Sequence, residues 1–153
     1  MSPENIIKGR IASTIVSLMF QEANYLVINY GYENFTSYLI QLGISRESQV
    51  AKRLIATPSF ILVNKKDGLV SLLQVKYQHT SASGRNIDWG YKKLQEYWPS
   101  GHLLLVHPRK PYFFLVTITQ KGLVALPLLD SKVFKIDKNV ILRFGPIVKK
   151  FLS

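Results

Sequence analysis

Apolar positions recur with a helical period in the first part of the chain and with a strand-like composition directly after it. Residues 3–23 begin with Pro3 and place apolar side chains every three or four positions, at Ile7, Ile11, Ile15, Leu18 and Met19. This spacing predicts a helix with that stripe buried. Residues 24–31, "NYLVINYG", are rich in β-branched and aromatic side chains and end at a glycine, which predicts a strand.

Residues 34–78 predict two short helices and a hairpin. Asn34 is placed to cap a helix that ends near Gly43, and Ser45 is placed to cap a second one. The stretch that follows, "TPSFILVNKKDGLVSLLQVKYQ" at residues 57–78, has two apolar segments around the turn sequence "KKDG". We expect two antiparallel strands there.

The second half of the chain predicts a further helix, two strands and a C-terminal helix. Asn86 is placed to cap a helix that stops before Pro99 and has one apolar face, made by Ile87, Tyr91, Leu94 and Trp98. Apolar segments at 102–107 and 112–119 predict two strands. The remainder predicts short strands or irregular structure, followed by a terminal helix that starts after Pro146.

This order of elements predicts an α/β fold with a mixed central β-sheet flanked by helices on both faces. The central strands are almost continuously apolar, which is typical of strands that are covered on both sides. A length of 153 residues fits one domain. We expect a single domain over residues 1–153, with its core at about 3–130 and a basic C-terminal extension at about 131–153.

Three polar side chains interrupt the apolar hairpin: Ser59, Gln74 and Lys76. If the turn is centred between Lys66 and Asp67, Ser59 lies opposite Gln74; if it is centred one residue later, Ser59 lies opposite Lys76. In either register the three side chains share one face of the sheet, because side chains alternate along a strand. They form either a polar site or a strand end that is open to solvent.

At these residues the chain resembles the PD-(D/E)XK nuclease superfamily, which has the restriction-endonuclease-like fold. The resemblance covers about residues 6–107: a long helix, a strand ending "YGYE", then "TPSF", a turn and "LLQVKY". In active members two carboxylates hold a divalent cation and a lysine acts on the attacking water and the phosphate. Pro58 and Lys76 match the motif, whereas Ser59 and Gln74 stand where acids are expected.

The resemblance therefore implies a degenerate catalytic motif that holds no metal. Ser13 stands near the position where such members carry a glutamate on the first helix, and Glu33 and Asp88 are acids that would have to move into the site. We expect no cofactor, with Mg²⁺ only if the protein is an enzyme with relocated ligands. The motif is short, and its placement on the expected elements supports it.

The charge of the chain predicts a polyanionic partner. Lys and Arg number 20 against 9 Asp and Glu, a net charge of +11, and the bases occur in scattered pairs. Such an excess favours nucleic acid, DNA or RNA, over a neutral partner. Residues expected to contact nucleic acid are Lys65, Lys66, Arg85, Lys92 and Lys93.

Several other classes of site and location are disfavoured. The chain has no cysteine, which excludes disulfides and thiolate zinc sites, and its three histidines lack ligand-like spacing. The longest apolar run, Leu123–Leu129, is interrupted by Pro127 and is too short to span a bilayer. The N-terminal residues do not resemble a secretory signal, so we expect no membrane association and a cytoplasmic location.

The sequence supports three hypotheses. The first is a nuclease-fold protein that binds nucleic acid and is catalytically inactive. The second is a divergent Mg²⁺-dependent endonuclease, or an enzyme like a Holliday junction resolvase, with relocated ligands. The third is a non-catalytic structural subunit with a protein partner, either in a homo-oligomer or in a ribonucleoprotein.

Overall fold

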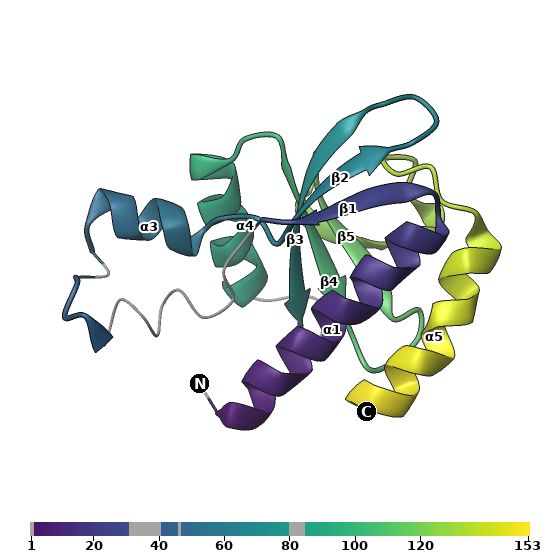
Figure 1. Ribbon diagram of the computed structural model, residues 1–153, viewed down its shortest axis with the longest axis horizontal. Coiled ribbons are helices and arrows are strands. Elements are labelled where there is room, and N and C mark those ends of the chain that lie inside the picture. The colour runs from purple at the N-terminus through teal and green to yellow at the C-terminus, as the bar shows by residue number, and fades with distance from the viewer. Residues whose placement is uncertain (1, 31–40, 46, 80–84) are drawn as a thin grey trace.

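The computed structural model describes residues 2–30, 41–45, 47–79 and 85–153 (Figure 1). The helices are α1 (Pro3–Glu22), α3 (Gln49–Ile55), α4 (Arg85–Tyr97) and α5 (Lys138–Leu152), with a 3-10 turn η1 (Leu128–Asp130). The strands are β1 (Tyr25–Asn29), β2 (Phe60–Asn64), β3 (Val70–Tyr77), β4 (Gly101–Val106), β5 (Phe113–Thr119) and β6 (Gly122–Pro127). The expected N-terminal helix, the strands β1 to β5 and helix α4 are confirmed, but α4 begins at Arg85, so Asn86 lies inside this helix and not at its N-cap position.

The strands form one six-stranded sheet in the order β1-β2-β3-β4-β5-β6. β3 and β4 pair in parallel and every other neighbouring pair is antiparallel, so the sheet consists of two three-stranded antiparallel meanders joined at β3 and β4. Helix α4 makes the crossover that a parallel pair requires. The expected α/β fold with a mixed sheet is therefore confirmed.

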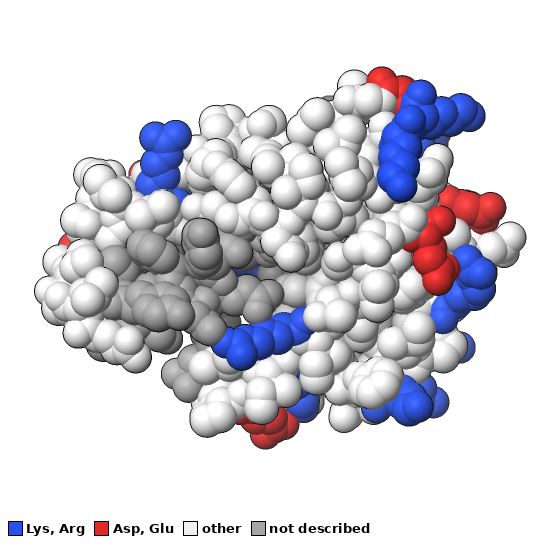
Figure 2. Space-filling model, in the orientation of Figure 1, with Lys and Arg blue, Asp and Glu red and all other residues white. Residues whose placement is uncertain are grey.

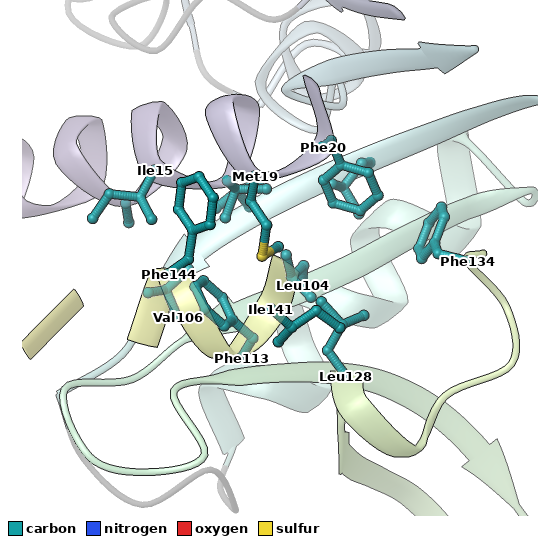
Figure 3. Close-up of a cluster of buried hydrophobic side chains, with 14 of the residues drawn as sticks. Ile15, Met19, Phe20, Leu104, Val106, Phe113, Leu128, Phe134, Ile141 and Phe144 are labelled. Carbon is teal, nitrogen blue, oxygen red and sulfur yellow. The ribbon is translucent and has the colours of Figure 1, made fainter. Parts of the chain in front are cut away.

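Helices cover both faces of the sheet. α1 and α5 lie side by side on one face and run in opposite directions (Figure 1). Their apolar side chains join those of the strands in the larger core, which Figure 3 shows around Met19, Phe113 and Phe144. α4 packs on the other face, where Ile87 and Leu94 contribute to a smaller core.

The buried face of α1 differs in part from the expected stripe. Ile15 and Met19 are buried as expected, but Ile7 is 56% exposed and Leu18 is 49% exposed. The face that packs on the sheet follows the helical spacing of Ala12, Ile15, Val16, Met19 and Phe20. Leu18 lies off this face. Ile7 is exposed because it belongs to the N-terminal end of α1, where residues 3–7 are all exposed.

The hairpin of β2 and β3 adopts the first of the two expected registers. Phe60 pairs with Leu73 and Leu62 pairs with Ser71, which centres the turn between Lys66 and Asp67. Continuing the same register by one position beyond Phe60 and Leu73 places Ser59 opposite Gln74.

Helix α5 begins earlier than expected. It starts at Lys138, with Pro146 in its interior, and Asp137 caps it by accepting a hydrogen bond of 2.8 Å from the Asn139 backbone N–H. An interior proline costs about 3 kcal/mol, but one fully buried large apolar side chain contributes about 1.5–3 kcal/mol. α5 buries several in the larger core: Val140, Ile141, Phe144, Val148 and Leu152. The core therefore continues past residue 130, which was its expected end.

The segment before the hairpin also differs from expectation. Asn34 lies outside the described residues, as does Glu33. Helix α3 is capped by Ser48, whose hydroxyl accepts a hydrogen bond of 3.1 Å from the Ala51 backbone N–H, and not by Ser45. None of the helices in the described ranges has both the length and the apolar character needed to cross a bilayer.

Candidate functional site

Strand β3 directs apolar and polar side chains to opposite faces of the sheet. Leu73 and Val75 are buried in the larger core with α1 and α5. Gln74 and Lys76 alternate with them and therefore point to the face that α4 covers. Both are only half-buried, because they line a cleft beside α4.

The cleft has a volume of about 580 Å³ and lies between β3, α4 and the region of α3. Its described lining consists of Glu47, Lys52, Ala56, Gln74, Lys76, Trp89, Gly90, Lys93 and Leu94. Lysines outnumber acids in this lining by three to one. The described part of the lining therefore carries a local excess of positive charge.

Lys76 is the most confined cation of the cleft. Its ammonium group lies against the backbone of α4 at Gly90, where an added Cβ would overlap Lys76 Nζ. Burial lowers the pKa of Lys76, because desolvation disfavours the charged form. None of the ion pairs within the described part of the chain includes Lys76. The side chain thus holds a partly desolvated charge without an acidic partner there.

Trp89 lies on α4 between two of these cations. Lys76 Nζ is 5.8 Å from the centroid of the Trp89 ring, and Lys93 Nζ is 5.5 Å from it. Lys93 is placed by the helix, since residues four apart lie on the same face. Trp89 is 60% exposed, so an aromatic surface with two neighbouring ammonium groups is open to solvent.

Gln74 supplies an unsatisfied acceptor. Its Oε1 atom is buried, and no donor in the described ranges lies within hydrogen-bond distance of it. A buried polar atom without a partner costs about 1–3 kcal/mol. Because Gln74 lines the cleft, a rotation of its side chain would present this acceptor to a ligand with an N–H or O–H group.

Lys52 and Glu47 face each other at the α3 side of the cleft. Lys52 Nζ lies 3.2 Å from Glu47 Oε2, and Glu47 is the one acid in the described lining. The Glu47 side chain is largely exposed, so the pair is weakly held and screened by salt.

Ser59 has a structural partner. Its hydroxyl accepts a hydrogen bond of 3.1 Å from the Val75 backbone N–H and continues the pairing of the hairpin beyond β2. Ser13 is buried in α1, which packs on the opposite face of the sheet from Gln74 and Lys76. The structure therefore brings Gln74 and Lys76 together in one cleft and places Ser13 elsewhere.

The residues at the motif positions do not fit a divalent cation. Mg²⁺ prefers carboxylate oxygens, whereas the three motif positions carry a serine hydroxyl already bonded to the backbone, an amide and an ammonium group. Within the described ranges, no three acidic, histidine or cysteine side chains lie close enough to hold a metal. Asp88 is exposed in the first turn of α4 and does not line the cleft.

The other basic residues expected to contact nucleic acid are distributed over the surface. Lys65 and Lys66 lie at the turn of the hairpin, at the other end of β3 from Lys76, roughly 20 Å along the strand at about 3.3 Å per residue. Lys92 is exposed on α4, Lys93 lines the cleft, and the Arg85 side chain is outside the described part. Figure 2 likewise shows Lys and Arg in separate groups across one face.

Sequence reasoning did not identify Lys52 or Gly90 as parts of the site, and it did not connect Trp89 with Lys76. Spacing alone relates Trp89 to Lys93 on one helix face. No local signal relates Lys52 or Gly90 to Lys76, because the tertiary fold brings α3 and α4 to β3.

Comparison with known proteins yields no match to a protein-family model and none to a curated protein. Among solved structures, the chain is similar to Hjc, a Holliday junction resolvase from Archaeoglobus fulgidus, an archaeal hyperthermophile. The alignment covers 86% of this chain and 97% of that chain, with 11% identity and a TM-score of 0.40. With so few shared residues, the function of the cleft has to follow from its own side chains.

Proposed function

We propose that the protein binds nucleic acid, DNA or RNA, through the cleft beside α4 and does not cleave it by metal catalysis. The observation that supports this most directly is Lys76, a partly desolvated cation with no acidic partner among the described residues. A buried charge is costly unless an opposite charge compensates it. A phosphate group supplies that charge.

The neighbouring charges suit the same ligand. Lys93 and Lys52 line the cleft with Lys76, and the net charge of +11 attracts a polyanion from a distance. Each phosphate that a lysine neutralises releases counterions, so affinity falls as the salt concentration rises.

Metal-dependent cleavage is the alternative that the sequence motif suggests. On our proposal, Ser59, Gln74 and Lys76 are a PD-(D/E)XK motif without its acids, and the lysine retains its contact with phosphate. We expect no cleavage of duplex or single-stranded DNA or RNA with Mg²⁺ or Mn²⁺. Cleavage that disappears in both Lys76→Ala and Asp88→Ala would instead favour an enzyme with relocated ligands.

A titration with a labelled oligonucleotide tests the binding proposal. Fluorescence anisotropy is measured between about 50 and 200 mM salt, with a single strand and with the same strand paired to its complement. Lys76→Gln removes one phosphate contact, so the slope of log affinity against log salt should fall by about 0.9 on the duplex and about 0.7 on the single strand.

The matched control is Lys121→Gln, which removes the same charge from the exposed turn between β5 and β6. It should change affinity and slope less than Lys76→Gln does. Equal effects of the two variants would mean that the cleft is not the binding site. Absence of binding at low salt would favour a protein partner.

A further inference from the structure

We infer, on the basis of the proposed nucleic-acid binding, that the cleft holds an unpaired base of a single strand. The base stacks on Trp89, the Gln74 side chain turns so that its Oε1 accepts from the N–H edge of the base, and the flanking phosphates contact Lys76 and Lys93. The protein on this assignment distinguishes single strands from duplexes by the availability of the base.

The first support is the exposed ring of Trp89. Large aromatic side chains are mostly buried, yet this one is 60% exposed at the cleft with two ammonium groups beside it. Both ammonium groups are more than 5 Å from the ring centroid. A base can therefore stack on the ring with the lysines beside it, close to the phosphates on either side of the base.

The second support is the acceptor at Gln74. A phosphodiester offers acceptors alone, so phosphate binding by Lys76 leaves Gln74 Oε1 without a partner. Each base carries N–H donors on its edge. In a duplex those on the Watson–Crick edge are used in pairing and the base faces are stacked, so an unpaired base is the part of a nucleic acid that offers both a free face and a free donor.

The size of the cleft agrees with this ligand. Its volume of about 580 Å³ lies within the range of about 300–1,000 Å³ that is typical of small-molecule sites. One base fits such a volume, whereas a duplex would have to lie across its rim and reach the lysines from outside.

The test compares Trp89→Ala with the parent on a single-stranded oligonucleotide and on the same strand annealed to its complement. Loss of one stacked base should weaken single-strand binding by about 5- to 150-fold and leave duplex binding unchanged. The slope of log affinity against log salt should stay at its parental value, because no charge is removed. The control is Phe151→Ala, which removes another exposed aromatic ring, on α5.

Tryptophan fluorescence gives a second readout. The chain has two tryptophans, and Trp98 is half-buried. Stacking on Trp89 should quench the fluorescence of the parent when the single strand is added, and Trp89→Ala, which retains Trp98, should show no such quenching.

Two results overturn the inference. Equal weakening on single strand and duplex assigns Trp89 a general role in the fold or charge of the cleft. If Trp89→Ala binds the single strand with the parental affinity and the binding is still salt-sensitive, no base stacks on Trp89. The proposed phosphate contacts would then be unaffected. If neither nucleic acid binds the parent at low salt, the proposed function fails together with the inference.

Discussion

The two faces of the sheet differ in how completely their side chains are buried. On the face covered by α1 and α5, the strands contribute apolar side chains to one extended core. On the face covered by α4, the apolar core is smaller, and Gln74 and Lys76 lie beside it in an open cleft. Strand β3 contributes to both, because its odd and even positions point to opposite sides.

This difference lets one strand contribute to the core and line the cleft at once. Leu73 and Val75 secure β3 from the side of α1, so the polar positions between them need not contribute to packing. The strand can therefore carry a lysine and a glutamine at these positions, although neither side chain packs in an apolar core. Variants on the two faces should then have separable effects on stability and on binding.

The largest expected effect comes from the packed face. Phe113→Ala removes a ring that is 1% exposed, and it should lower the free energy of unfolding by about 3–5 kcal/mol. The matched control is Phe114→Ala, which removes the next side chain of β5, half-buried on the α4 face. Urea denaturation of both variants measures the difference, and an equal loss in Phe114→Ala would contradict the contrast between the faces.

A smaller effect is expected at Ser59. Ser59→Ala leaves the Val75 backbone N–H without its acceptor, which should lower the free energy of unfolding by about 1–3 kcal/mol. Ser59→Thr keeps the hydroxyl and should retain most of the stability. Chemical denaturation tests this structural role. If Ser59 contributes nothing to the fold, Ser59→Ala will leave the free energy of unfolding unchanged.

Gly90→Ala should separate stability from binding. Alanine favours a helix over glycine by about 1 kcal/mol, but its Cβ would displace the Lys76 ammonium group from α4. We expect a stability gain of up to about 1 kcal/mol together with weaker nucleic-acid binding. Gly9→Ala on α1 is the control, since a Cβ there meets nothing within 4 Å. It should give the stability gain alone.

The smallest expected effect has a pH signature. Lys76→Met removes the desolvated charge, so at neutral pH the variant should be slightly more stable than the parent. The pKa of Lys76 is lowered in the folded state, so between that value and the unfolded value of about 10.5 the unfolded chain binds more protons. The free energy of unfolding of the parent, relative to that of the variant, should therefore rise with pH through this window. Urea denaturation at neutral and at high pH measures this difference. A difference that does not change with pH would rule out burial of the charge as its cause.

Local patterns were sufficient to predict β1 to β5 and the face shared by Gln74 and Lys76, whereas they did not distinguish a short strand from irregular structure at β6. Side-chain alternation is a property of the strand itself, so it survives any choice of register. The start of α5 was predicted wrongly because an interior proline is a strong local signal, whereas the burial of Phe144 and its neighbours arises from packing on α1. Ser13 was placed near the site from a motif, but α1 packs on the face of the sheet opposite to Gln74 and Lys76.

The registers of the sheet have a consequence for the order of folding. Paired residues in the β2–β3 hairpin and in the β4–β5–β6 meander lie closer together in the chain than those of the parallel pair β3–β4. Contacts between near residues close earlier than those between distant ones, so we expect these two antiparallel units to form before α4 brings β3 against β4. The Lys76 ammonium group meets the backbone of α4 only when α4 packs beside β3. Lys76 should therefore oppose the docking of the two units rather than the formation of either one.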